Sequence, residues 1–153
     1  MNSTDSDPLK AVAAAAPPED SGASIAGDKM LHFIIEKFDS TLLAAVGLQR
    51  LLAAIVKDML EDSAKAKGMI LRRDGDDIFS GDRKLSISIA TQSPVSSLIH
   101  FAVNVTNQGT PVKTLALDDL GVEAQPFAIK VMDVFTTEVE SIIAATQKVR
   151  WVK

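Results

Sequence analysis

Polar side chains that could do chemistry recur at every second position of two segments, residues 84–91 and 97–106. Large apolar residues occupy most of the positions between them, and a period of two predicts strands with one apolar face and one small, polar face. A floor of small side chains edged by an ammonium, an imidazole and an amide is typical of a groove that binds a small ligand. The small or polar positions are Lys84, Ser86, Ser88 and Ala90 in the first segment, and His100, Ala102 and Asn104 in the second.

The two segments predict an antiparallel hairpin that turns at a loop around Pro94. Both small faces then lie on the same side of the sheet, and a slip of two residues leaves this unchanged. Two alternatives stay open, in which this face is the solvated side of the sheet or is covered by a helix. A register centred on Pro94 sets Lys84 opposite Asn104, Ser86 opposite Ala102, and Ser88 opposite His100.

Two adjacent carboxylates, Asp76 and Asp77, follow Arg72 and Arg73. They are typical of a charged loop, although such a pair could also hold magnesium or form an interaction patch. The chain has no cysteine and only two histidines, which excludes disulfides and cysteine nucleophiles and argues against an imidazole-based metal centre. The sequence contains no glycine series for phosphate binding and no specific Ser-His-Asp spacing. We therefore predict no resident metal site.

Composition limits the partners of the chain. Its 153 residues suit one core, and a hydrophobic fraction of 46% is enough to build it. A net charge of -4 argues against a nucleic-acid partner, because phosphate binding needs concentrated lysine and arginine. No apolar stretch reaches the roughly 18 residues of a membrane span, and no secretory signal precedes the domain. We expect a cytoplasmic protein that binds neither nucleic acid nor membrane.

The first part of the chain divides into a tail and two predicted helices. Residues 1–28 are rich in Ala, Ser, Asp, Gly and Pro and lack aromatic residues, which predicts a mobile low-complexity tail with a helical turn at residues 11–16. Residues 29–153 are predicted to form a single domain. Within it, apolar periodicity predicts helices over 29–38 and 41–61, with a break at Asp39 and a cap at Ser40.

The remaining elements predict the fold class. Short strands at 69–71 and 78–79 flank the charged loop at 72–77, and a tight turn follows at 80–82. Pro126 suits the first turn of a closing helix over 127–147. Together these elements predict an α+β fold with a mixed or mainly antiparallel sheet backed by helices. The predicted inner side of the closing helix carries Phe127, Val131, Val134, Phe135, Ile142 and Ile143.

Part of this pattern resembles the central motif of biotin and lipoate protein ligases. The residues that carry the resemblance are Asp77-Ile78, Gly81-Asp82-Arg83-Lys84-Leu85-Ser86 and Val103-Asn104-Val105. The resemblance implies a core similar to that of these ligases and of class II aminoacyl-tRNA synthetases. It also implies that Lys84 contacts an acyl carboxylate and an adenylate phosphate, with ATP and magnesium as candidate cofactors.

The resemblance assigns further roles at the same site. Asp77 would position a metal ion or Lys84, and His100 would orient a polar group of the substrate. The remaining ligand-binding candidates are Arg83, Ser86, Ser88 and Asn104.

A second resemblance covers residues 28–153. The chain is similar to an uncharacterised prokaryotic family, the domain of unknown function family three hundred and sixty-six, whose activity is not established. The segments that carry this likeness are Met30-Leu31-His32-Phe33-Ile34, Gly75-Asp76-Asp77, Gly81 to Ser86, Ser93 to His100, Gly109-Thr110-Pro111-Val112 and Val149-Arg150-Trp151.

Two functional hypotheses follow. In the first, the chain binds a small carboxylate or nucleotide-like ligand on the ligase-like sheet face, as a remote acyl-adenylate-forming ligase. In the second, it is a non-catalytic binding or oligomeric assembly domain, favoured by Ile87 at a position where the ligases carry glycine. The sequence leaves open the ligand, the retention of catalysis, the oligomeric state and the completeness of the N-terminus.

Overall fold

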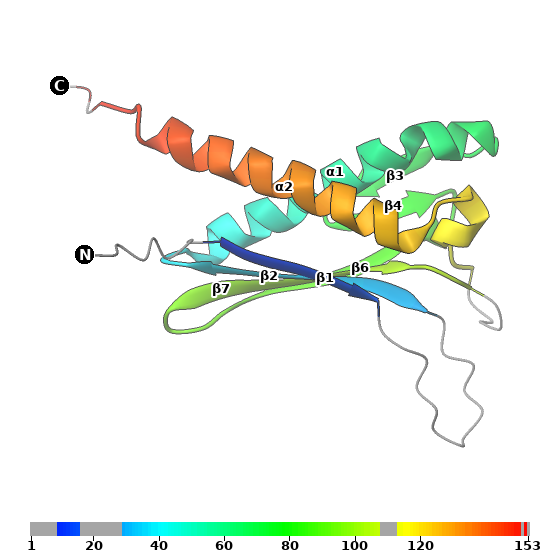
Figure 1. The fold of residues 1–153 in the computed structure, drawn as a ribbon, viewed down its shortest axis with the longest axis horizontal. Helices are drawn as coiled ribbons and strands as arrows, with labels where there is room; N and C mark the ends of the chain where they lie inside the picture. The colour runs from blue at the N-terminus through cyan, green and yellow to red at the C-terminus, as the bar shows by residue number, and fades with distance from the viewer. Residues whose placement is uncertain (1–8, 16–28, 108–112, 151, 153) are drawn as a thin grey trace, which may run out of the picture.

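The computed structural model describes residues 9–15, 29–107, 113–150 and 152, and these form two antiparallel sheets and two long helices (Figure 1). The larger sheet has the strand order β1-β2-β7-β6 and the smaller has the order β3-β4-β5. This arrangement confirms the predicted α+β class with a mainly antiparallel sheet backed by helices. The strands are β1 (Leu9–Ala15), β2 (Met30–Phe38), β3 (Leu71–Asp74), β4 (Asp77–Ser80), β5 (Arg83–Lys84), β6 (Ser86–Gln92) and β7 (Ser96–Asn104).

The helices α1 (Leu42–Ala66) and α2 (Ala124–Thr146) pack on one face of the larger sheet (Figure 1). The core lies between the helices and this face. Phe33 of β2 and Phe101 of β7 are fully buried there and meet edge to face, with ring centroids 6.4 Å apart, a geometry that aromatic pairs favour. A short 3-10 helix, η1 (Leu117–Leu120), precedes α2. Neither helix is long and apolar enough to cross a membrane, within the residues that are described.

Strand β2 corrects the prediction of a helix over residues 29–38. The segment pairs with β1 on one side and β7 on the other, and its burial alternates, with Leu31, Phe33 and Ile35 inside. A short run of mostly apolar residues fits a strand as well as a buried helix. The strand is favoured because β2 pairs with β1 on one edge and β7 on the other, so its backbone N–H and C=O groups find partners on both sides.

Strand β1 corrects the helical turn predicted within the tail. Residues 9–15 pair antiparallel with β2, from Leu9 opposite Lys37 to Ala15 opposite Leu31. Residues 11–15 are therefore strand where a helical turn was predicted over 11–16, and residue 16 lies outside the described residues. Amino-acid composition did not predict this strand. The strand is stabilised by pairing with β2, and the residues of the segment itself show no apolar alternation that would indicate this pairing. Residues 1–8 and 16–28 of the predicted tail lie outside the described residues.

The predicted helix over 41–61 is confirmed, and it continues to Ala66. The N-cap is Thr41 rather than the predicted Ser40, since Thr41 Oγ1 accepts a hydrogen bond of 3.1 Å from the backbone N–H of Ala44. Gln49 lies on the buried side of this helix with 6% of its surface exposed.

A β-hairpin replaces the charged loop predicted over residues 72–77. Strands β3 and β4 pair from Leu71 opposite Ser80 to Asp74 opposite Asp77, which leaves a two-residue turn at Gly75 and Asp76. Gly75 has a φ of 62°, a left-handed conformation that glycine adopts at no steric cost. The next tight turn, at Gly81, is confirmed and joins β4 to β5.

The closing helix is confirmed as α2, with Pro126 in its first turn. Its buried side differs in part from the prediction, because Ala128 and Val139 are buried whereas Val134 and Ile142 are 45% and 41% exposed. The helix therefore presents a narrower stripe to the core than its apolar content suggests.

Candidate functional site

The hairpin of β6 and β7 forms as predicted, but its register differs by one residue. Ser86 lies opposite Val103 and Ile87 opposite Ala102, whereas the predicted partner of Ala102 was Ser86. Because side chains alternate between the two faces of a strand, a shift of one residue moves every side chain of β6 to the other face. Ile87 and Ile89 accordingly lie on the open face of the sheet, and Ser86 and Ser88 point toward the helices.

A polar network explains why the serines face inward. Ser88 Oγ donates to Asp76 Oδ2 over 2.6 Å and accepts from Gln49 Nε2 at 2.8 Å. Gln49 Nε2 also lies 3.2 Å from the same carboxylate oxygen. Ser86 is 3% exposed and its Oγ accepts from the backbone N–H of Ile78. Buried polar groups that are satisfied in this way fix one arrangement of the elements, here α1, the β3–β4 turn and β6.

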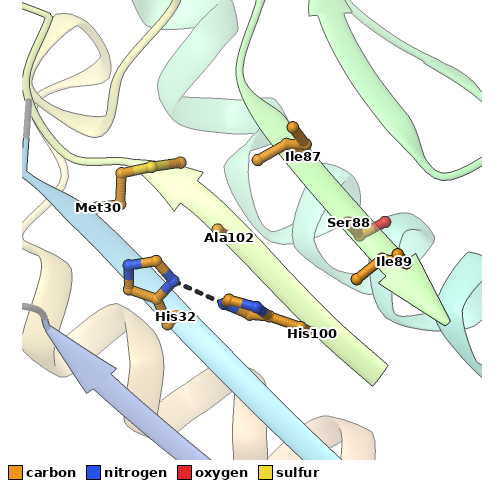
Figure 2. Close-up of a pocket in the computed structure, with 7 residues that line it drawn as sticks. All are labelled: Met30, His32, Ile87, Ser88, Ile89, His100 and Ala102. Carbon is orange, nitrogen blue, oxygen red and sulfur yellow. Dashed lines mark hydrogen bonds between the residues drawn. The ribbon is translucent and has the colours of Figure 1, made fainter. Parts of the chain in front are cut away.

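The open face of β2, β7 and β6 carries a pocket of about 390 Å³ (Figure 2), a size within the range of small-molecule sites. Its walls are mostly apolar, and His32 and His100 supply the imidazoles (Figure 2). The lining residues are Met30, His32, Ile87, Ser88, Ile89, His100 and Ala102. Of these, the sequence placed His100, Ser88 and Ala102 on a ligand face and missed His32, because residues 29–38 were predicted as a helix. Ser88 borders the pocket, but its hydroxyl bonds to Asp76 and Gln49 on the helix side of the sheet.

The two histidines are diagonal neighbours on adjacent strands. Ala102 is the cross-strand partner of His32, and Ile34 is the partner of His100. A diagonal separation is within reach of large side chains, and His32 Nδ1 and His100 Nε2 are hydrogen-bonded at 2.7 Å (Figure 2). Burial lowers the pKa of His32 below its ordinary value of 6.5, and the nearby charge of protonated His100 lowers the pKa further.

This pKa shift predicts a loss of stability on mild acidification. Below pH 6.5 an unfolded chain protonates His32 before the folded protein does, so the unfolded state binds more protons. The free energy of unfolding should therefore be highest above pH 6.5 and decline as the pH falls through the lowered pKa of the folded protein. Urea unfolding monitored by circular dichroism at several pH values measures this. A His32→Gln variant with an unchanged decline in this window would contradict the assignment.

Two of the three predicted catalytic residues lie together, away from the third. Lys84 Nζ and Asp77 Oδ1 form an ion pair of 2.8 Å on the smaller sheet, with the two side chains 39% and 32% exposed. The ammonium also lies 5.9 Å from the centroid of the Phe79 ring. Lys84 is not among the residues that line the pocket. The structure thus separates Lys84 and Asp77 from His100, which the predicted register had placed near Lys84 on one face.

The polar atoms of Arg83 and Asn104 are engaged within the fold. The Arg83 guanidinium donates to Asp119 Oδ2 at 2.7 Å and to the backbone carbonyl of Thr114 at 3.0 Å. Asn104 Nδ2 donates to the backbone carbonyls of Lys84 and Leu115. These contacts join β5 and β7 to the segment that leads into η1. The predicted ligand-binding role of both residues stays a prediction.

Carboxylates and imidazoles do not gather into a metal centre in the part of the chain that the structure describes. No three side chains of His, Cys, Asp or Glu lie there close enough together to hold an ion. Asp76, one of the two adjacent carboxylates that could have held magnesium, is hydrogen-bonded to Ser88 and Gln49, and Asp77 is paired with Lys84.

Comparisons with known proteins identify relatives of unknown function. The model of the family described as Domain of unknown function (DUF366) matches residues 14–150. Uncharacterized protein MJ0805 from Methanocaldococcus jannaschii is 39% identical over 101 residues, which cover 65% of this chain and 44% of that protein. The alignment therefore spans less than half the length of that relative.

Solved structures confirm the fold expected from the ligase resemblance. A protein of unknown function from Pyrococcus horikoshi is 40% identical, with a TM-score of 0.73 over 83% of this chain and 67% of that one. The biotin protein ligase from Aquifex aeolicus, solved in complex with biotin and ATP, superposes with a TM-score of 0.56 at 16% identity, over 72% of this chain and 50% of that one. At this identity the second likeness concerns the fold alone.

Proposed function

Because the chain belongs to the family described as Domain of unknown function (DUF366), which supplies a fold and no activity, we propose a function from the site itself. The chain binds a small molecule with an apolar body and a carboxylate or other polar end, in the pocket on the open face of β2, β7 and β6. The single observation that carries this proposal is an apolar cavity that contains two imidazoles. Apolar walls with a few convergent polar groups are typical of small-molecule sites.

The fold is compatible with a small-molecule ligand, and the position of the helices favours the pocket face. The ligase of Aquifex aeolicus, which shares the fold, is described in complex with biotin and ATP. In the present chain the helices cover one face of the larger sheet (Figure 1), so the pocket face is the one that a ligand can reach. Exposed Ile87 and Ile89 supply apolar surface that a bound ligand would remove from water.

Substitution of Ala102 tests this proposal. Ala102 lies between His32 and Ile87 in the sheet and lines the pocket, so Ala102→Phe places a ring in the space for the ligand. Calorimetric titration with octanoate, biotin and AMP is expected to show binding of at least one probe, and the variant should lose at least about tenfold in affinity, or about 1.4 kcal/mol.

Thr91→Phe is the matched control for this substitution. Thr91 is an exposed residue of β6 outside the pocket lining, so a ring there should leave affinity unchanged. Absence of heat with all three probes, or equal loss in both variants, would overturn the proposal.

The finer form of the proposal is acyl-adenylate formation with ATP as co-substrate. One carboxylate oxygen of the ligand attacks the α-phosphorus of ATP and forms the acyl–phosphate bond. The bond from the α-phosphorus to the oxygen that bridges to the β-phosphate breaks, and pyrophosphate leaves with the electron pair. Lys84 and Asp77 pair on the smaller sheet, outside the pocket lining, so this form of the proposal requires the nucleotide to extend from the pocket to that sheet, where the ammonium would offset the negative charge on the phosphate oxygens. Magnesium would be held mainly by the nucleotide, as is usual for this ion.

A second candidate function, non-catalytic assembly, is favoured by apolar exposure on the same face. Ile34 is 49% exposed, and Ile87 and Ile89 are each 59% exposed, which could equally be covered by a second copy of the chain. Sedimentation velocity separates the two candidates. A stable oligomer that does not respond to any probe would support assembly, whereas a monomer that binds a probe would exclude it.

A further inference from the structure

The two imidazoles of the pocket share one hydrogen bond, which limits their protonation. His32 Nδ1 and His100 Nε2 are 2.7 Å apart, so one of these nitrogens carries a hydrogen and the other is bare. If both rings were doubly protonated, two N–H groups would point at each other across this distance. The pair therefore holds at most one positive charge while the contact persists.

The other nitrogen of each ring is free to meet a ligand. Among the described residues, His32 Nε2 and His100 Nδ1 have no hydrogen-bond partner. In the neutral pair one of them carries a hydrogen and the other is bare, which suits an amide. After uptake of one proton both carry a hydrogen. The protonated pair then presents an N–H donor at each end together with a positive charge, and a carboxylate can accept from one of these donors while its charge is attracted to the pair.

Within the residues that the structure describes, the strands beside the pair supply no compensating charge. In the sheet, His32 is flanked by Ala14 of β1 and Ala102 of β7, and His100 by Ile34 of β2 and Ile89 of β6. The other lining residues are uncharged.

The next acid along β2 and the lysine of β5 already have partners. Glu36, the next acid along β2, accepts a hydrogen bond from Ser96 Oγ at 2.8 Å. Lys84 is paired with Asp77. A ligand carboxylate would therefore meet the imidazole pair without a competing acid in the pocket lining.

From this geometry we propose that the His32–His100 pair takes up one proton when the pocket binds a carboxylate, so that carboxylate and proton enter together. The inference rests on the proposed ligand-binding function and specifies its ligand class as a carboxylate with an apolar body. A ligand anion stabilises the protonated pair, because opposite charges in an apolar site attract more strongly than in water. A neutral amide with the same apolar body has no charge to stabilise the protonated pair, so its binding should not involve uptake of a proton.

Calorimetry with octanoate and octanamide tests the proton. At a pH above the ordinary histidine pKa of 6.5, octanoate is titrated into the protein in two buffers that differ in ionisation enthalpy. The difference in heat should correspond to uptake of about one proton per octanoate, and the affinity should fall about tenfold for each further pH unit. Octanamide should bind with equal heats in both buffers and with an affinity independent of pH.

Each outcome decides a different part of the inference. Octanoate binding without proton uptake, or octanamide binding without octanoate binding, overturns the inference and leaves the proposed binding function standing. Failure of both probes, together with biotin and AMP, overturns the proposed function and this inference with it.

The double variant His32→Gln with His100→Gln distinguishes the pair from other proton acceptors, because either imidazole alone could still take up the proton. Glutamine keeps a hydrogen-bonding side chain on the pocket but cannot take up a proton. Residue 32 is half-buried and residue 100 is exposed, so the double variant should fold, which circular dichroism checks. Proton uptake with octanoate should disappear in the variant while octanamide binding persists. Undiminished proton uptake would assign the proton to another group and overturn the inference.

Discussion

Lys84→Ala is expected to lower ATP–pyrophosphate exchange about 10²- to 10³-fold in the presence of the carboxylate that the pocket binds. In the proposed reaction the ammonium of Lys84 offsets charge on the phosphate, and Asp77 holds it in place at 2.8 Å. Removal of the ammonium leaves that charge to solvent and to magnesium, which raises the barrier. Exchange of labelled pyrophosphate into ATP measures the rate directly.

Two controls separate the chemistry from folding in this experiment. Both partners of the Lys84–Asp77 pair are about one-third exposed, so its loss should change the free energy of unfolding by only about 0–1 kcal/mol. Lys113→Ala breaks a comparable pair with Asp82 at 2.7 Å on the surface and should leave exchange unchanged. Wild-type protein without exchange for any bound carboxylate would end the catalytic form of the proposal while leaving the binding form intact.

Ser88→Ile is expected to destabilise the fold by about 3 kcal/mol, although it makes β6 more apolar. The new side chain would enter the half-buried network and overpack it, and Gln49 Nε2 would lose one partner, each effect costing about 1–3 kcal/mol. The network atoms are Ser88 Oγ, Gln49 Nε2 and Asp76 Oδ2, within 3.2 Å of one another. Urea unfolding, with an unchanged slope against denaturant, gives the difference.

Ile89→Ser is the matched substitution on the other face of the same strand. Because Ile89 is 59% exposed, its loss should cost less than about 1 kcal/mol. The comparison tests the register itself. A large effect for Ile89→Ser with a small one for Ser88→Ile would show that the isoleucines face the core, as hydropathy predicts.

The sequence predicted the elements whose signals are local. The helix over residues 42–66 follows a long apolar periodicity next to a threonine cap, and the strand at 96–104 alternates cleanly. The run at 29–38 was wrongly predicted as a helix because its apolar residues fit either period over so short a length. Its true period shows only in the alternation of His32 with Leu31 and Phe33, a signal that would also have placed His32 in the pocket.

The pairing register of β6 and β7 depends on hydrogen bonds within the turn that joins them. The predicted register, centred on Pro94, did not take these bonds into account. Ser93 N donates to the backbone carbonyl of Ser96 at 2.8 Å, and Ser93 Oγ accepts from the backbone N–H groups of Val95 and Ser96. These bonds place the turn between Pro94 and Val95, half a residue beyond the predicted centre. That small difference moves the pairing by one residue and exchanges the two faces of β6.

The candidate site was predictable where its contacts are close in sequence and not where they are distant. The Lys84–Asp77 contact was anticipated from the ligase resemblance, whose residues lie close together in the sequence. The pocket was not, because its composition depends on which face of β6 is open and on pairing between strands about 70 positions apart.

Ser88 of β6 connects the pocket wall to the β3–β4 hairpin, which lies on the opposite side of the larger sheet. Ile87 and Ile89, which form one wall, flank the residue that Asp76 anchors. Without the Ser88–Asp76 hydrogen bond, strand β6 could shift by one residue against β7. The serines of β6 would then replace the isoleucines in the pocket wall. An apolar cavity would become a hydroxyl-lined surface with no change in sequence near the ligand. Under the proposed function, a substitution in the β3–β4 turn would therefore change the pocket wall from the other side of the sheet.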